Sequence, residues 1–130
     1  MNAPEVAPLS RTLTQEMLNA YAAASGDRNP IHIDEAFAKT TPMGGTIAHG
    51  MLVLSFIAQM MTAAFGPRWL ASGSLDVRFR APARPGDTVT ARATPLEPRE
   101  GRHRYAVECV SQAGEVLISG TAEVPQGAEA

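Results

Sequence analysis

Hydrophobic and polar residues recur with a helical period in the first half of this chain and alternate in the second half. Residues 15–25 place apolar side chains on one helical face, with Thr14 as a candidate N-cap, and Asp34 can cap a shorter helix at residues 35–39. Alternation with turn sequences between the segments predicts strands at residues 9–13, 75–79, 89–93, 105–109 and 116–124.

The most apolar stretch of the chain begins after Gly50. Between residues 51 and 64, the only polar residues are Ser55, Gln59 and Thr62. A helix that is apolar on nearly every face is expected to be buried all round, so other elements must wrap it. The run is shorter than the ~18 to 20 residues that span a bilayer, and strands follow it, so we expect a core helix and no membrane association.

One short strand before this helix and four strands after it suit an antiparallel sheet curled round the helix, which is an α+β arrangement. The chain shows no internal repeat and no change in composition, so we expect a single domain over residues 1–130. Residues 1–8 are rich in Ala and Pro and are expected to be loose. Pairing with a second copy would protect the edges of such a sheet.

Composition narrows the classes of partner. The 130 residues carry a net charge of −2, which gives no electrostatic reason to expect nucleic acid or an anionic membrane and favours a small-molecule partner. The single cysteine, Cys109, excludes an internal disulfide and a cysteine-based zinc site, and its place in an alternating segment predicts core packing. The N-terminus lacks the basic start and apolar core of a signal peptide, so we expect a cytoplasmic protein.

The candidate chemistry lies in a turn before the apolar helix. Asn29-Pro30 bends the backbone between Asp27 and His32, so both side chains can face one cavity. A carboxylate and an imidazole at one cavity form a candidate proton-transfer pair that needs no cofactor. The same residues also suit a structural role, in which Asp27 caps backbone N–H groups and His32 fills a hydrogen-bonded pocket.

Gly50 stands at the start of the apolar helix. The first turn of a helix has unpaired backbone N–H groups and the positive end of the helix dipole. The N–H of Gly50 is therefore a candidate donor to a developing oxyanion.

Two separated motifs carry a family resemblance. The run Y-A-A-A-S-G-D-R-N-P-I-H-I-D-E-A-F-A, followed by I-A-H-G-M, resembles the MaoC-like, (R)-specific enoyl-CoA hydratases and related 3-hydroxyacyl dehydratases of the hot-dog fold. The resemblance covers nearly the whole chain and is densest from Tyr21 to Met51. It implies a hydro-lyase acting on an acyl-CoA or acyl-carrier-protein thioester without a cofactor. It also implies a homodimer or a dimer of dimers, with the acyl pocket at or near the dimer interface.

The resemblance also assigns roles. Asp27 and His32 would hold a water molecule, one group taking its proton during attack on the β-carbon and one supplying a proton to the α-carbon. The Gly50 N–H would bind the thioester oxygen, and Asn29 would fix the bend. For His49 we favour a structural hydrogen bond over a catalytic role.

Three alternatives accompany this interpretation. A metal site would gather His32, Asp34 and His49, but we expect none, because an extended H-I-D segment would place two ligands poorly. A thioesterase could use the same fold. A non-catalytic acyl-CoA-binding or assembly subunit is disfavoured because both proposed catalytic residues are present.

Two sets of residues are candidates for the rest of the substrate. Carrier phosphates would have to meet scattered cations, of which the candidates are Arg68, Arg78, Arg80, Arg84, Arg102 and Arg104. Acyl chain length would depend on side chains of the helix and the following loop, with candidates Ala58, Met60, Met61, Phe65, Trp69 and Leu70. Trp69 and Leu70 are expected to form either a lid or an interface patch.

Overall fold

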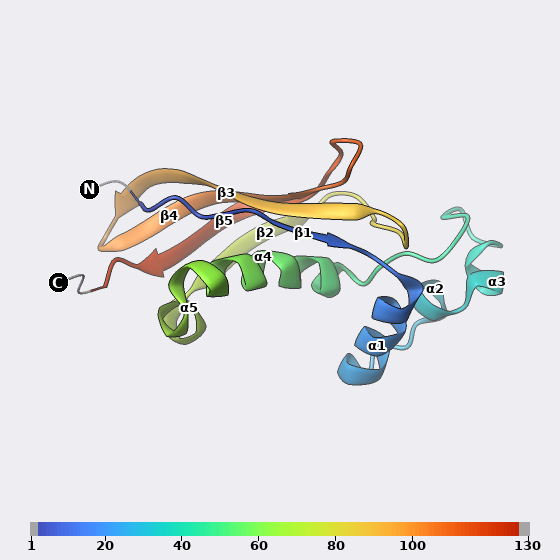
Figure 1. The fold of residues 1–130 in the computed structure, drawn as a ribbon. Helices are drawn as coiled ribbons and strands as arrows, with labels where there is room; N and C mark the ends of the chain where they lie inside the picture. Colours follow the sequence, from blue (N-terminus) through green and yellow to red (C-terminus); the bar gives the residue numbers. More distant parts are fainter. Residues whose placement is uncertain (1–2, 128–130) are drawn as a thin grey trace.

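A five-stranded antiparallel sheet covers one long helix in the computed structural model, which describes residues 3–127 (Figure 1). The helices are α1 (Gln15–Ser25), α2 (Pro30–Ile33), α3 (Glu35–Ala38), α4 (Gly50–Phe65) and α5 (Pro67–Ser72). The strands are β1 (Leu9–Thr12), β2 (Ser74–Phe79), β3 (Thr88–Arg99), β4 (Arg102–Val110) and β5 (Val116–Pro125). The predicted α+β arrangement is confirmed. None of the helices in the described range is long and apolar enough to cross a bilayer.

The sheet has the strand order β1-β3-β4-β5-β2, so the two strands that flank the helices in sequence lie at its opposite edges. β2 pairs only with β5, in a register that sets Val77 opposite Gly120. A Cβ atom on Gly120 would lie 2.1 Å from the Asp76 carbonyl oxygen, so this close approach of the two strands requires glycine.

Helix α4 packs one face on the sheet. The buried residues recur at helical spacing and are Leu52, Val53, Phe56, Ile57, Met60, Met61 and Phe65. On the other side, Met51 is 56% exposed, and Gln59 and Ala63 are also exposed. The prediction of a helix buried all round is therefore wrong for a single chain, because the sheet curls over only one side of α4.

The segment before β1 is not loose. Ala3 and Val6 are buried in the core, and the Tyr105 hydroxyl donates a 2.6 Å hydrogen bond to the carbonyl of Pro4. The prediction of a loose N-terminus is therefore wrong at Ala3 and Val6, because these apolar side chains pack into the core, while residues 4, 5, 7 and 8 are exposed. Residues 1–2, to which the same prediction applied, lie outside the described residues.

Trp69 and Leu70, which the sequence analysis treated as one lid or interface patch, differ in burial. Trp69 is 8% exposed and packs in the core, whereas Leu70 on the opposite face of α5 is 73% exposed. A Cβ atom on Gly73 would lie 2.2 Å from the Trp69 ring, which shows how closely the backbone passes over it. Trp69 is therefore a core residue and not a lid.

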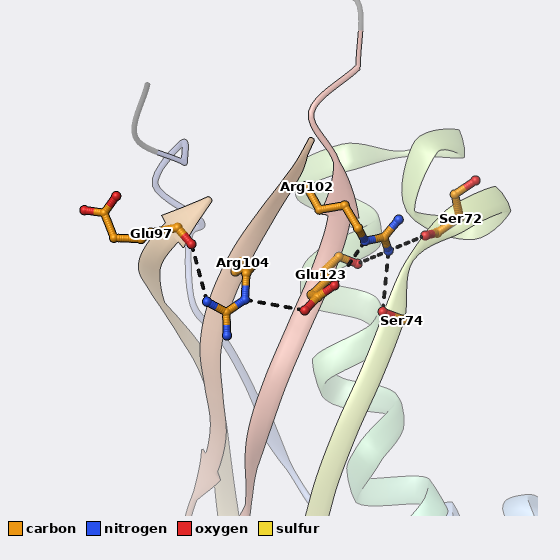
Figure 2. A network of polar contacts seen from close by, with 6 residues as sticks. All are labelled: Ser72, Ser74, Glu97, Arg102, Arg104 and Glu123. Atoms are coloured by element: carbon orange, nitrogen blue, oxygen red, sulfur yellow. Dashed lines mark hydrogen bonds and ion pairs between the residues drawn. The ribbon is translucent and has the colours of Figure 1, made fainter. Parts of the chain in front are cut away.

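A polar network closes the end of the sheet next to α5 (Figure 2). Glu123 forms ion pairs with both Arg102, at 3.1 Å, and Arg104, at 3.4 Å. Arg102 also donates to the carbonyl of Ser72 at 2.9 Å. The network thereby ties β4 and β5 to the end of α5.

Candidate active site

A turn after α1 carries the first candidate residue. Gly26 has φ 82° and ψ −2°, a left-handed conformation that ends α1 and leads into Asp27. The Asp27 carboxylate accepts a hydrogen bond from the Asn29 N–H, and the Asn29 side chain accepts one from Ile31 and caps α2. Pro30 occupies the first turn of α2, where a missing N–H costs nothing. The expected bend thus becomes a one-turn helix.

That helical turn brings His32 beside Asp27. His32 Nε2 lies 3.8 Å from Asp27 Oδ2, and the two side chains are 12% and 55% exposed, respectively. His32 Nδ1 lies 2.8 Å from the carbonyl oxygen of Ile47. Because a carbonyl only accepts, Nδ1 carries a hydrogen, and Nε2 is the ring nitrogen directed toward the carboxylate.

His49 lies behind this pair, at the N-cap of α4. Its side chain is buried, and its Nε2 lies 3.0 Å from the backbone carbonyl oxygen of Asp27. The His49 ring stacks on His32 with centroids 3.8 Å apart and an interplanar angle of 24°. Its other neighbour is the ring of Tyr21, at 4.7 Å. His49 Nδ1 has no hydrogen-bond partner among residues 3–127.

Gly50 is the first residue of α4. The first backbone bonds of the helix run from Leu52 and Val53 to the carbonyl of His49, so the Gly50 N–H has no acceptor within the helix. A cavity of about 340 Å³ brings Gly50 and His32 together. Its walls are mostly apolar and consist of Ile47, Ala48, Val53, Phe79, Arg80, Ala81, Pro82, Ala83 and Ile118.

Asp27, His32 and His49 form a cluster of titratable side chains whose geometry does not suit metal binding. Potential ligand atoms of Asp27, His32 and His49 lie within 4.8 Å of one another. The two rings are stacked, however, so their in-plane lone pairs lie in nearly parallel planes and converge on no common point within bonding distance. Each ring also has one nitrogen bonded to a carbonyl. The geometry of this cluster therefore does not suit a metal ion.

The structure also corrects the metal set considered from sequence. Asp34 is not near the two histidines as a ligand, because its carboxylate caps α3 through the Phe37 N–H at 3.1 Å. The H-I-D segment is not extended, so the reason given against a metal was wrong, although the expectation of no metal is unchanged.

Sequence reasoning missed most of the cavity wall. None of the six chain-length candidates lines it, and Met60 and Phe65 instead line a separate cavity of about 450 Å³ beside Pro4 and Glu5. The helical period could have indicated this, because Val53 is the α4 residue one turn after Gly50. The alternation in β2 likewise assigns Phe79 to the face that packs on α4.

The six candidate arginines have different surroundings. Arg102 and Arg104 pair with Glu123 (Figure 2), and Arg68 donates to the carbonyls of Pro125 and Gln126. Arg80 is the only one of the six that lines the 340 Å³ cavity, and its Nε donates to Ser119.

Comparisons with known proteins identify the family of the chain. The model of the MaoC-like domain matches residues 2–115. The (R)-specific enoyl-CoA hydratase of Rhodospirillum rubrum is 38% identical over 124 residues, which cover 91% of this chain and 83% of that protein. The 3-hydroxybutyryl-CoA dehydratase of Methylorubrum extorquens is 35% identical, over 94% of this chain and 80% of that protein. The unliganded R-hydratase PhaJ1 of Pseudomonas aeruginosa superposes with a TM-score of 0.85 at 32% identity, covering 96% of this chain and 81% of that one.

Proposed function

The chain belongs to the MaoC-like domain family and has the hot-dog fold, and we propose that it adds water reversibly to a 2-enoyl thioester, giving the (R)-3-hydroxyacyl thioester. Its relatives carry the names of enoyl-CoA hydratases and 3-hydroxyacyl dehydratases, which are lyases. One observation carries the assignment to residues. His32 and Gly50 line one largely apolar cavity, and Asp27, which is not among the lining residues, lies 3.8 Å from His32 Nε2. The reaction needs no cofactor.

The proton count of the reaction fits this pair. Asp27 starts as a carboxylate, and His32 starts with hydrogens on both nitrogens. A water molecule that bonds to both groups attacks the β-carbon and loses one proton to Asp27. His32 gives its Nε2 proton to the α-carbon. After the product leaves, the proton on Asp27 returns to His32 across the 3.8 Å gap, and the pair is restored.

The thioester carbonyl is held at the start of α4. Attack on the β-carbon moves negative charge onto the thioester oxygen, and the Gly50 N–H donates to that oxygen at the positive end of the helix dipole. The acyl chain then lies against apolar side chains of the same cavity, among them Val53, Phe79 and Ile118. In this proposal, the acyl group is carried by CoA or by acyl-carrier protein.

We also propose that the chain forms a homodimer. β2 is an edge strand, and Phe79 at its end and Met51 at the start of α4 are exposed apolar residues beside the cavity. Pairing β2 with a second copy would cover this edge and these side chains. A monomer in sedimentation equilibrium at micromolar concentration would contradict this proposal.

The test of the reaction uses crotonyl-CoA. We expect wild-type protein to remove the enoyl-thioester absorbance without releasing free thiol, which a thiol reagent reports in a parallel well. Asp27→Asn and His32→Ala should each lower kcat by roughly 10²- to 10⁴-fold while the far-UV circular dichroism stays unchanged.

Each other outcome overturns a definite part of the proposal. Thiol release would make the protein a thioesterase. Near wild-type hydration by folded Asp27→Asn would remove Asp27 from the chemistry. Inactivity on crotonyl-CoA and on a series of longer enoyl-CoA esters and enoyl-acyl-carrier-protein thioesters would favour a binding subunit.

A further inference from the structure

We propose that His49 is a positioning residue that joins the acid–base pair to the oxyanion N–H as one rigid unit. This inference rests on the hydratase function proposed above. His49 bonds to the turn that carries Asp27, stacks on His32 and directly precedes Gly50. It therefore contacts the backbone of Asp27, the ring of His32 and, through the peptide bond, Gly50.

The hydrogen bond fixes the tautomer of His49. Its Nε2 faces the carbonyl oxygen of Asp27 at 3.0 Å, and a carbonyl can only accept, so Nε2 carries the hydrogen. The bond holds the main-chain carbonyl of Asp27. The Asp27 N–H donates to Ser25 Oγ and its carboxylate accepts from the Asn29 N–H, so both of these bonds stay within two residues of Asp27. The bond from His49 thus fixes this turn to the start of α4, whereas the other bonds of the turn are local.

The ring contact fixes the face of His32. His32 is bonded through Nδ1 to Ile47, which sets one in-plane direction but leaves the ring free to tilt about that bond. The His49 ring lies against its face at 3.8 Å, and the Tyr21 ring lies 4.7 Å from His49, tilted by 59°. This stack removes the tilt and keeps His32 Nε2 directed toward Asp27.

His49 acts through these neighbours and not on the substrate. Its side chain is 2% exposed, and it is not among the residues that line the 340 Å³ cavity. Packing alone gives no reason for an imidazole here, because the buried Nδ1 lacks a partner within the described chain and such a group destabilises a fold. The Nε2 hydrogen and the flat ring are what the site uses.

The test separates the hydrogen bond from the ring. His49→Phe keeps a flat ring and loses the donor, and His49→Gln keeps an N–H donor that can reach the Asp27 carbonyl. With crotonyl-CoA, we expect His49→Phe to lower kcat by roughly 10- to 100-fold with KM within about twofold, because small displacements of reacting groups cost rate. Its Tm should not fall, because the buried Nδ1 is removed. His49→Gln should recover at least half of the lost activity on a logarithmic scale.

A matched control comes from the other buried histidine. His103 stacks on Phe65, the last residue of α4, with centroids 6.2 Å apart. Because this contact lies at the opposite end of α4 from Gly50, His103→Phe should leave kcat unchanged. The proposal is overturned if His49→Phe keeps kcat within about twofold of wild type. It is also overturned if both His49 variants lose kcat and Tm together, because a purely structural role predicts that result.

A second measurement does not depend on activity. Nitrogen NMR of histidine-labelled protein should show His49 as the Nε2–H tautomer, and its signals are assigned by their loss in His49→Gln. In His49→Phe, the His32 resonances should broaden or shift because the donor no longer holds the turn. The opposite tautomer of His49, or unchanged His32 resonances, would overturn the proposal even if the hydratase function itself failed.

Discussion

Aromatic rings and charged side chains lie at both ends of α4, but the polar groups are open to solvent or a cavity at one end and paired with each other at the other end. At the N-terminal end, the Asp27 carboxylate is more than half exposed, and His32 and the Gly50 N–H face a cavity. At the far end, Arg102 and Arg104 share Glu123, so these charges are compensated within the protein (Figure 2). Polar groups paired with each other stabilise a fold, whereas groups directed at an open cavity can bind and transform a ligand.

Cavity volume alone would have pointed to the wrong end. The cavity beside Phe65 and Arg68 is larger, at about 450 Å³ against about 340 Å³. Its ionisable residues are Glu5 and Arg68, and Arg68 is bonded to backbone carbonyls and lies 5.3 Å over the Phe65 ring. Within the described chain, the residues that line this cavity include the carboxylate of Glu5 but no histidine. The chemistry of the lining residues therefore identifies the site better than the size of the cavity.

The largest expected effect lies at the C-terminal end and concerns stability. Trp69→Ala removes a buried indole and should lower the free energy of unfolding by about 3 to 5 kcal/mol. Leu70→Ala changes an exposed side chain and should stay within about 0.5 kcal/mol. Urea unfolding measures both. If Trp69→Ala instead keeps its stability and changes KM for enoyl-CoA esters, Trp69 acts as a lid and the contrast between the two ends fails.

The next effect concerns catalysis at the N-terminal end. Gly50→Pro deletes the N–H but suits the first helical position, and His49, with φ −60° and ψ 134°, has the conformation that precedes proline. Gly50→Ala is the matched control, because a Cβ atom in either variant meets the same exposed Phe79 ring at 3.0 Å. Relative to Gly50→Ala, we expect Gly50→Pro to lower kcat by roughly 10²- to 10³-fold.

The stability of both Gly50 variants provides the check. Thermal unfolding should give them similar Tm values, since neither breaks a bond within α4. Equal kcat values for the proline and alanine variants would show that this N–H does not bind the thioester oxygen. The N-terminal end would then rely on the Asp27–His32 pair alone.

Sequence periodicity predicted the elements well because their signals are local. The alternation at residues 75–79 and the cap at Thr14 each correspond to an observed strand or helix start. The turn between Asp27 and His32 was also recognisable, because Asn29-Pro30 restricts the backbone on its own. These are features that a few neighbouring residues decide.

The remaining features depend on contacts that are distant in sequence. The stack of His49 on His32 and the split between Trp69 and Leu70 follow from how α4 and α5 lie on the sheet, which no local pattern encodes. The wall residue Ile118 comes from β5, whose place beside β2 is set by the strand order. The candidates chosen from α4 by sequence proximity therefore do not include Val53, the α4 side chain that lines the 340 Å³ cavity.

The smallest expected effect is the pH dependence of stability away from the site. Burial raises the pKa of Tyr105 from 10.0 to about 12, with a smaller opposing effect of Arg68, and burial with Glu108 raises the pKa of Cys109 from 9.0 to about 12. The folded chain keeps protons that the unfolded chain releases, so their stabilising contribution is complete below about pH 9 and is lost as the pH rises toward 12. In urea unfolding, Tyr105→Phe should reduce the loss of stability above pH 10, and Cys109→Ala should reduce the loss of stability from pH 9 upward. An unchanged slope of unfolding free energy against pH in both variants would show that these groups titrate alike in the folded and unfolded chain.

Neither group lines the 340 Å³ cavity, so neither variant should change the shape of the pH profile of kcat below pH 9.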